Sequence, residues 1–341
     1  LISGTGALVL WFFPGLVASY YVIPFFLGAT ILPLVAISEI QDSIARAFNW
    51  ATVSLWPTYI VRPLLILVVM LIAIVAGAKP DAITALWSVI AATYIATLGQ
   101  MLWLRCRIAT VVAPGPRAYA TRAWFVLALP MFFVEGIFNM LINIDILMVG
   151  YFMSPDQVGV YFAASKTLAL VHFVYYAVRA GGAQRFSQYH AAGDMVRLRA
   201  FVHDTLHWTF WPSLAMVVLV LILGKPLLMM FGPGFDSGYP LLAVLSIGIL
   251  ARAAIGPAET LLIMAGQQRI CAWVYGAALL FALALNLALI PAFGLYGAAW
   301  ATTITLIVES ICLYVIAHAR LGIRALVFLA MFRQDRSVGA S

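Results

Sequence analysis

Long apolar runs alternate with short polar breaks along almost the whole chain. About ten runs are present, the first of them incomplete, and the others have the length of roughly 20 residues that a helix needs to cross a bilayer. Many apolar positions are β-branched, but lipid requires backbone polar groups to pair within one segment, which favours helices. The pattern predicts spans over 1–14, 20–44, 53–77, 82–104, 124–150, 158–179, 207–223, 239–265, 271–290 and 295–318.

The composition indicates the same class of protein. Hydrophobic residues make up 65% of the chain, charged residues only 9%, and the mean hydropathy is +1.06. Soluble domains contain about 25% charged residues, so we predict an all-α, polytopic membrane helix bundle. The chain begins with Leu1 inside an apolar run rather than with Met. We therefore expect that residues of the natural N-terminus precede it.

The basic residues predict the orientation of the spans. The net charge is +7, but the basic residues lie in loops and form no stripe on a soluble module, which argues against nucleic-acid binding. One set of alternate loops carries thirteen arginines, and the opposite set carries only Lys79 and Lys225. Positive residues mark the cytoplasmic side, so the C-terminus is predicted in the cytoplasm. The thirteen are Arg46, Arg105, Arg107, Arg117, Arg122, Arg185, Arg197, Arg199, Arg269, Arg320, Arg324, Arg333 and Arg336.

The chain shows no sign of catalysis, and no cofactor is expected. Zinc-protease, redox, phosphate-loop and nucleophile-elbow motifs are all missing from contexts that would confirm them. The five histidines are scattered, and Cys106, Cys271 and Cys312 lie far apart, so no metal site is predicted. The predicted external loops are short. A non-enzymatic membrane protein is the resulting expectation.

Two polar segments on the predicted cytoplasmic side are the longest, at 106–123 and 181–206. The second has an amphipathic helical period, which predicts a helix lying in the membrane interface. Glu39, Asp42 and Arg46 lie near a predicted cytoplasmic helix end, and we expect them to form a solvated local network.

The two apolar runs between Trp124 and Arg179 are joined by the tight turn Ser154–Pro155–Asp156 and contain several charges. A charge near mid-bilayer costs about 2.5–3.5 kcal/mol, so such residues face other helices or a wet cavity. In the second run, Ser165, His172 and Arg179 are seven residues apart, with Tyr176 close to the same line and Lys166 on a neighbouring face. This helix is predicted to present cations and hydroxyls to an anionic ligand, with interfacial snorkelling as the alternative for Arg179.

The first run of this pair carries acidic and amide side chains. Glu135, Asn139 and Asn143 follow one another at four-residue steps, and Asp145 projects from a different side. Ion pairing of Asp145 with Lys166 across the turn would neutralise both charges. Ion coupling is the other interpretation of Asp145, since intramembrane ionisable groups are functional by default yet usually paired.

Charged residues also occur in other predicted spans. Arg252 and Glu259 lie seven residues apart, which on one straight helix separates them by about 10 Å and prevents a direct salt bridge. Glu309 lies on the last long predicted helix. Arg62 is the corresponding intramembrane cation in the N-terminal half.

The order of several motifs resembles a known family. The run IDILMVGYFMSPDQVGVYFAASKTLAL resembles the start of the second lobe in Wzx-type polysaccharide flippases, where an Asp-containing helix, a short external loop and a VGxY helix follow one another. The resemblance continues through GPGFDSGYPLL, the MAGQQR turn and LNLALIPAFGLYGAAWAT. It covers most of 124–318 and, more loosely, 20–104.

The resemblance implies the MATE-like fold of the multidrug/oligosaccharidyl-lipid/polysaccharide flippase superfamily, with two six-helix lobes around a central cavity. On this basis the chain begins within the third helix of the fold, and about two and a half helices precede it. The implied regions are a partial N-terminal lobe at 1–110, a cytoplasmic linker at 111–123, a six-helix lobe at 124–318 and a cytoplasmic tail at 319–341.

The resemblance also implies a function. Such proteins flip undecaprenyl-pyrophosphate-linked oligosaccharides across the bacterial cytoplasmic membrane by alternating access, for O-antigen, capsule or exopolysaccharide. Partners would be the lipid-linked oligosaccharide, membrane lipids and polysaccharide polymerase or assembly proteins, with H⁺ or Na⁺ as candidate coupling ions. Because Arg and Lys hold pyrophosphate through charge-assisted bonds, the candidate cavity residues are Arg62, Lys166, His172, Tyr176, Arg179 and Arg252, and the candidates for ion coupling or structural pairing are Glu135, Asp145, Glu259 and Glu309.

Two other functions remain open. A drug or cation antiporter of the same superfamily would favour acidic and aromatic cavity residues, because its cargo is cationic. A membrane component of polysaccharide assembly that does not itself transport is the second alternative. A membrane glycosyltransferase or ligase is disfavoured, because it would require a large external domain.

Overall fold

The computed structural model describes residues 19–48, 50–112, 115, 119–323 and 326–327. It divides into two compact units, Leu1–Tyr119 (unit 1) and Ala120–Ser341 (unit 2), which we describe separately. The division falls within 111–123, the stretch expected to link two lobes. The sequence-based limits of lobes, linker and tail stay predictions. The predicted first span, 1–14, lies outside the described residues.

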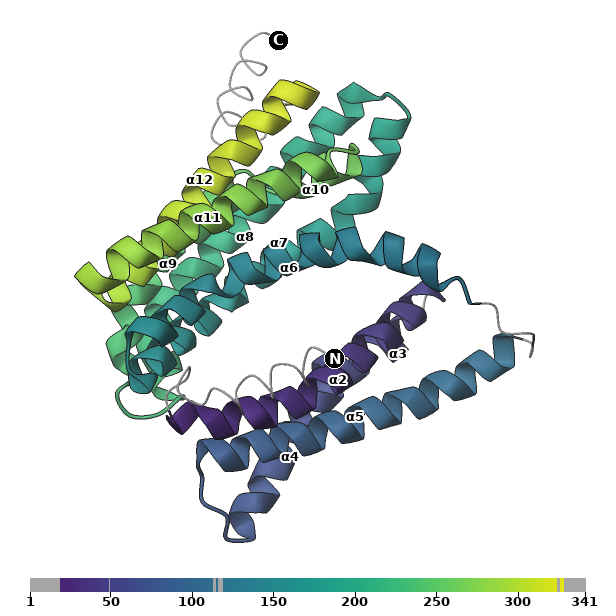
Figure 1. Cartoon of the computed structure of the whole chain (residues 1–341). Helices are drawn as coiled ribbons and strands as arrows, with labels where there is room; N and C mark the ends of the chain where they lie inside the picture. Colours follow the sequence, from purple (N-terminus) through teal and green to yellow (C-terminus); the bar gives the residue numbers. More distant parts are fainter. Residues whose placement is uncertain (1–18, 49, 113–114, 116–118, 324–325, 328–341) are drawn as a thin grey trace. The chain divides into compact units, whose positions relative to one another are not determined.

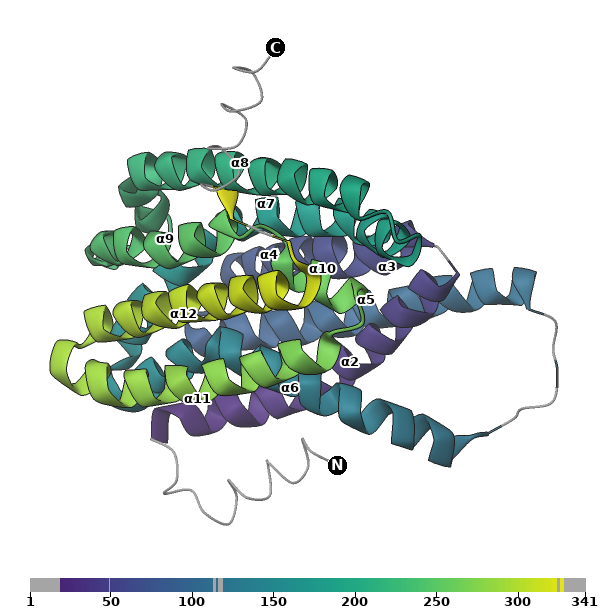
Figure 2. The same cartoon turned by 90° about the horizontal axis from the view of Figure 1, so that it is seen from above.

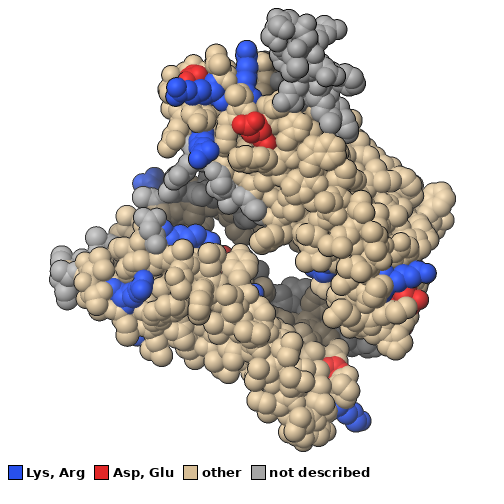
Figure 3. Space-filling model, turned by 180° about the vertical axis from the view of Figure 1, so that it is seen from behind, with Lys and Arg blue, Asp and Glu red and all other residues tan. Residues whose placement is uncertain are grey.

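The predicted fold class, a polytopic helical membrane bundle, is confirmed. Eight described helices are long and apolar enough to cross a membrane, and Gly136–Phe152 is a shorter apolar helix. Large apolar side chains such as Phe173 and Leu280 are exposed, as expected for helices that contact lipid. Figure 3 shows only scattered Lys, Arg, Asp and Glu side chains on the face it presents.

The described part of unit 1 contains three helical stretches long enough to cross a membrane. They are α2 (Ser19–Ala47), the continuous stretch of α3 (Ala51–Trp56), η2 (Pro57–Val61) and α4 (Arg62–Val75), and α5 (Ala82–Val111) (Figure 1). The middle crossing contains a π-helical turn at η2, where Pro57 and Pro63 supply no backbone N–H to the helical hydrogen-bond ladder. The Asp81 side chain caps α5 by accepting a 2.8 Å hydrogen bond from the Thr84 N–H.

A buried polar network, rather than a solvated one, surrounds Asp42 in unit 1. Gln100 Nε2 donates to one carboxylate oxygen of Asp42 at 2.6 Å, and Thr58 Oγ1 donates to the other at 3.0 Å. Asp42 is buried, whereas Arg46 is exposed and contacts Ser43 instead. The predicted network of Asp42 with Arg46 is therefore wrong, because the face of α2 that carries Asp42 packs against α5.

Unit 2 begins with the helical hairpin of α6 (Thr121–Phe152) and α7 (Pro155–Ala191). The predicted turn between them is confirmed. Ser154 caps α7 in a capping box with Gln157, and Pro155 occupies the first helical position, where its missing N–H is not needed.

The predicted interfacial helix over 181–206 is wrong. Residues up to Ala191 continue α7, and Asp194 caps the start of α8 (Met195–Met229), so the segment is the tip of a second hairpin of long helices (Figure 1). Its apolar side chains, including Phe186, Leu198 and Phe201, are buried in a protein core. The amphipathic period of the sequence thus reflects helix packing rather than membrane binding.

The predicted span over 239–265 is broken into two helices, α9 (Tyr239–Ala254) and α10 (Ala258–Met264), preceded by the short η3 (Phe235–Gly238). The break centres on Gly256, whose φ of +54° is rarely adopted by other residues. A Cβ atom there would also lie 2.9 Å from Leu206 Cδ2. Both conditions favour glycine at this position.

The last two helices, α11 (Gln268–Phe293) and α12 (Leu295–Leu321), form a close hairpin. They run side by side in both cartoon views (Figures 1 and 2). Gly294 makes the turn with φ +59° and ψ −135°, a conformation that favours glycine. At Gly297, any Cβ would overlap the backbone carbonyl of Leu289.

Two apolar clusters make up most of the core of unit 2. The first cluster includes Val149, Tyr161, Leu241 and Ala298, and the second includes Phe186, Phe201, Ile255 and Leu313. Along α7, α9 and α12, the residues between the two clusters include polar and charged side chains, among them His172, Arg252 and Glu309. The unit therefore holds a polar layer between two apolar ones.

We predict that Gly297→Ala lowers the free energy of unfolding by about 1–3 kcal/mol, the usual cost of overpacking a close contact. Gly276→Ala is the matched control, because Gly276 lies in α11 with open space where its Cβ would be. Alanine has the higher helix propensity, so the control should be neutral or slightly stabilising. Denaturant titration in detergent micelles measures both, and equal stability of the two variants would contradict the close packing of α11 on α12.

Candidate functional site

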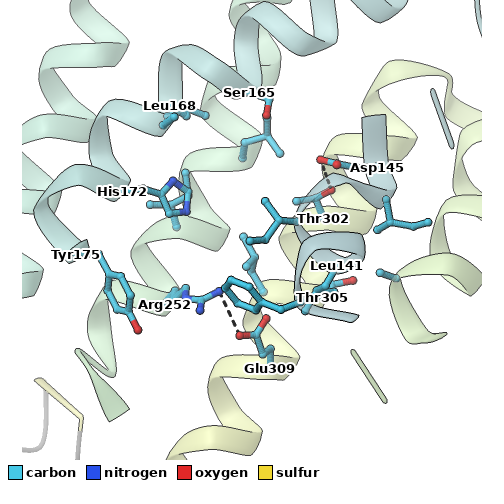
Figure 4. Close-up of a pocket in the computed structure, with 18 of the residues that line it drawn as sticks. Leu141, Asp145, Ser165, Leu168, His172, Tyr175, Arg252, Thr302, Thr305 and Glu309 are labelled. Carbon is cyan, nitrogen blue, oxygen red and sulfur yellow. Dashed lines mark hydrogen bonds and ion pairs between the residues drawn. The ribbon is translucent and has the colours of Figure 1, made fainter. Parts of the chain in front are cut away.

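A cavity of about 270 Å³ lies inside unit 2, lined mainly by α6, α7, α9 and α12 (Figure 4). We call it the unit 2 cavity. Its apolar lining includes Phe138, Leu141 and Ile249. Its polar and charged lining residues are Asp145, Ser165, Lys166, His172, Tyr175, Arg252, Thr302, Thr305 and Glu309.

Helical spacing brings these side chains to one place. On α7, Ser165 and His172 are seven residues apart, as two turns of one face require, and both line the cavity. On α12, Thr302, Thr305 and Glu309 recur at intervals of three and four and also share one face. The predicted polar face of α7 is thus present in the structure at Ser165 and His172.

Arg252 lies at the centre of a buried charged cluster, which we call the Arg252 cluster. Arg252 Nη2 donates to Glu259 Oε2 at 3.2 Å, and Arg252 Nη1 lies 3.2 Å from Glu309 Oε1. The guanidinium carbon is 5.4 Å from the centre of the Tyr175 ring, within the range of a cation–π contact. The Tyr175 hydroxyl donates to Glu259 Oε2 at 3.3 Å.

The prediction that Arg252 and Glu259 lie too far apart for a salt bridge is wrong. It assumed a straight helix, in which seven residues extend about 10 Å. The break at Gly256 redirects the chain between the two residues. As a result α10 turns the carboxylate of Glu259 back toward the guanidinium of Arg252.

The burial of the Arg252 cluster is uneven. The Arg252 side chain is 15% exposed, compared with 4% for Glu259 and 2% for Glu309. Glu259 accepts hydrogen bonds from Arg252 and Tyr175, whereas neither carboxylate oxygen of Glu309 accepts one from the described residues. Removing two carboxylates and a guanidinium from water is costly, and their mutual attraction offsets this only in part.

Asp145 is held by hydroxyl groups rather than by a cation. Its Oδ2 accepts hydrogen bonds from the Tyr161 hydroxyl at 2.9 Å and from Thr302 Oγ1 at 3.3 Å, and its Oδ1 accepts one from the Ile146 N–H at 2.8 Å. Lys166 is exposed, and its Nζ lies 5.1 Å from the centre of the Phe162 ring. The hypothesis that Asp145 pairs with Lys166 is therefore wrong, because Asp145 is directed toward α12.

Several predicted site residues cannot be placed at this cavity. Arg62 belongs to unit 1, where it begins α4 and is half-buried. Tyr176 and Arg179 lie on α7 and Glu135 lies on α6, but their side chains fall outside the described part of the structure. Their proposed roles stay predictions.

The sequence pattern did not identify Tyr161 and Tyr175 as hydrogen-bond partners of the acidic residues. Tyr161 lies in an apolar stretch and is fully buried, so its hydroxyl has no evident role in the sequence alone. A signal was present, since Tyr161 precedes Ser165 by four residues and shares its helical face. The pairing of Tyr175 with Glu259 depends on the break before α10 and has no comparable signal.

Comparison with known proteins gives one family and a common fold. The MatE family model matches residues 130–288. Among solved structures, a lipid II flippase MurJ in an inward closed conformation is similar with a TM-score of 0.71 and 14% identity, covering 97% of this chain and 73% of that one. No curated protein sequence matches the chain.

Two MATE structures share the fold as well. A MATE protein in complex with MaL6 has a TM-score of 0.63 at 12% identity, covering 88% of this chain and 70% of that one. An outward-facing multidrug resistance MATE transporter of the MOP superfamily has a TM-score of 0.59 at 13% identity, covering 89% and 69%. The chain therefore shares the fold of these proteins over most of its length, and the MatE model matches just under half of it.

We predict that Tyr161→Phe lowers the free energy of unfolding by about 1.5–3 kcal/mol, because it removes a hydrogen bond to a buried carboxyl group. Tyr239→Phe is the matched control, since the Tyr239 hydroxyl donates to the neutral carbonyl of Leu221 at 3.0 Å. Its loss should cost only about 0.5–1.5 kcal/mol. Denaturant titration in detergent micelles measures both.

A double-mutant cycle completes this test. In an Asp145→Asn background, Tyr161→Phe should cost less than in the wild type, because the charged acceptor is gone. Equal costs in the two backgrounds would show that the Tyr161–Asp145 hydrogen bond contributes nothing particular to stability.

Proposed function

We propose that this protein flips undecaprenyl-pyrophosphate-linked oligosaccharide across the bacterial cytoplasmic membrane by alternating access, for O-antigen, capsule or exopolysaccharide synthesis. The unit 2 cavity would bind the anionic headgroup of the lipid carrier. The cytoplasmic C-terminus expected from the basic loops belongs to the same proposal.

One observation carries the proposal: among the charged side chains that line the unit 2 cavity, the two cationic ones are the more exposed. Lys166 is exposed, and Arg252 exposes 15% of its side chain. The lining carboxylates are far less accessible, at 6% for Asp145 and 2% for Glu309. An anion entering the cavity would therefore meet an ammonium and a guanidinium, the groups that bind phosphate through charge-assisted hydrogen bonds.

The position of the cavity along the helices fits a transport site. His172 and Tyr175 on α7, Arg252 on α9, and Thr302, Thr305 and Glu309 on α12 lie between the buried residues of the two apolar clusters, and Ser165 and Lys166 lie within the first cluster's stretch of α7. If the apolar clusters lie toward the two membrane faces, the cavity lies near the middle of the bilayer. Secondary transporters place their substrate sites there, next to broken helices such as the α9–α10 pair.

The similar proteins support the same reading. MurJ, which shares the fold over 97% of the chain, is named as a lipid II flippase. The motifs around Asp145 and Tyr161 resemble those of Wzx-type polysaccharide flippases. Tyr176, Arg179 and Arg62 are retained in this proposal as further headgroup contacts, and Glu135 as a candidate for ion coupling.

A cation or drug antiporter is the second candidate, and the charge count favours it. Among the described residues in and beside the cavity, three carboxylates (Asp145, Glu259 and Glu309) stand against two cations (Lys166 and Arg252). A multidrug MATE transporter also shares the fold. The two candidates differ in the charge of the cargo, so an assay with lipid-linked anions and with organic cations separates them.

Lys166 is the cleanest cation to test, because Arg252→Gln would leave two buried carboxylates without their partner. We expect Lys166→Gln to slow flipping of a fluorescent undecaprenyl-pyrophosphate oligosaccharide about tenfold, which corresponds to losing ~1.4 kcal/mol of interaction with the headgroup. Flipping is followed in proteoliposomes of the natural full-length protein by dithionite quenching of lipid in the outer leaflet.

Lys225→Gln provides the matched control. Lys225 also stacks on an aromatic ring, that of Tyr239 at 5.6 Å, but it does not line the cavity. Its flipping rate should match that of the wild type. Ethidium transport without flipping by the wild type would establish the antiporter instead, and equal rates for the two lysine variants would exclude Lys166 from headgroup binding.

A further inference from the structure

Arg252 contacts two carboxylates, and only one of them lines the unit 2 cavity. Glu309 is a lining residue, together with Arg252 itself, whereas Glu259 is not. Figure 4 shows Arg252 and Glu309 facing each other at the cavity, with His172 and Tyr175 nearby. The two acidic partners of Arg252 are therefore not equivalent.

Two hydrogen bonds hold the Glu259 carboxylate in place. It accepts hydrogen bonds from Arg252 Nη2 and from the Tyr175 hydroxyl, and it connects α10 to α9 across the break at Gly256. Its side chain is 4% exposed and does not line the cavity. Glu259 thus holds one side of the guanidinium and leaves the other side to Glu309.

Glu309 makes fewer contacts in this cluster than Glu259 does. Its Oε1 is 3.2 Å from Arg252 Nη1, but this ion pair lacks the alignment of a hydrogen bond, and neither oxygen accepts a hydrogen bond from any described residue. A buried carboxylate without hydrogen-bond donors is costly. The contact with Arg252 Nη1 is therefore the one in this cluster that a better-placed anion most readily replaces.

We propose that Glu309 is an internal competitor for the anionic headgroup at Arg252, so that it sets how tightly the cargo binds and how readily it leaves. This inference rests on the proposed function, since it requires a phosphate-type anion in the cavity. A phosphate oxygen takes the place of Glu309 beside Arg252 Nη1, while Glu259 keeps Nη2. After the cargo leaves, Glu309 returns and the guanidinium is never left without a second anion.

Competition of this kind serves a transporter. Two free cations in a cavity of low dielectric would hold a pyrophosphate so tightly that release would limit turnover. The displaced Glu309 carboxylate remains close to the bound anion and repels it, which lowers the affinity. The affinity of the site must be high enough for the cargo to enter and low enough for it to leave, as in other conducting and transporting sites.

The test compares Glu309→Gln with Glu259→Gln in the natural full-length protein in nanodiscs. Binding of undecaprenyl pyrophosphate is measured by native mass spectrometry, with undecaprenol as the probe that lacks phosphate. We expect Glu309→Gln to bind undecaprenyl pyrophosphate about tenfold more tightly than the wild type, with undecaprenol binding unchanged. Flipping of the fluorescent oligosaccharide lipid should become slower, because release is slower.

Glu259→Gln should tighten binding less than Glu309→Gln and should lower the thermal unfolding midpoint, because it weakens the link across the helix break. Glu309→Asp, which keeps the charge but withdraws it from Nη1 by one methylene, should give an intermediate affinity. It also provides a second variant if Glu309→Gln folds poorly.

The outcomes distinguish a failure of this inference from a failure of the proposed function. Equal tightening in Glu309→Gln and Glu259→Gln would show that only the total charge matters, and unchanged affinity in Glu309→Gln would show that Glu309 does not compete. Either result overturns this inference and leaves the proposed function standing. Failure of the wild type to prefer undecaprenyl pyrophosphate over undecaprenol would overturn the proposed function itself.

Discussion

Inside a bilayer no water is available to satisfy polar groups, so every buried charge and every backbone amide must find its partner within the chain. This constraint accounts for most of the arrangement of unit 2. Arg252 is surrounded by two carboxylates and an aromatic ring, and Asp145 by two hydroxyls and a backbone N–H. Within each set the side chains come from different helices, so the polar contacts also join the helices that pack together.

The same constraint limits where helices can be interrupted. The break between α9 and α10 lies against Leu206 of α8, inside protein rather than in contact with lipid. Glycine permits the close approach, and the Arg252–Glu259 ion pair joins the two pieces. The interruption and the charged cluster are thus one structural feature, since the break brings Glu259 within reach of Arg252.

Much of the fold could be predicted from the sequence because hydrophobic length is a strong and local signal in membrane proteins. The helical class and the Ser154 turn follow from apolar runs, a capping box and a proline. The polar face of α7 follows from the spacing of Ser165 and His172. Each of these depends on residues that are close in the sequence.

What could not be predicted depends on tertiary contacts. The salt bridge of Arg252 with Glu259 requires a bend that the apolar pattern does not reveal, and the Asp145–Tyr161–Thr302 contacts join three helices. The prediction of an interfacial helix over 181–206 is wrong because the apolar face of this stretch packs on protein. A helix packed on protein and a helix lying on a membrane have the same periodicity, so the sequence alone does not distinguish them.

The Arg252–Glu259 contact also has a mechanical meaning. A continuous helix transmits force through its ladder of backbone hydrogen bonds, but between Ala254 and Ala258 that ladder is interrupted, and a side-chain ion pair bridges the gap. The stiffness of this crossing therefore depends on a guanidinium that also faces the cavity. A solute that draws the guanidinium toward itself would act on the same ion pair that joins α10 to α9, so binding in the cavity and the geometry of the helix break share a single residue.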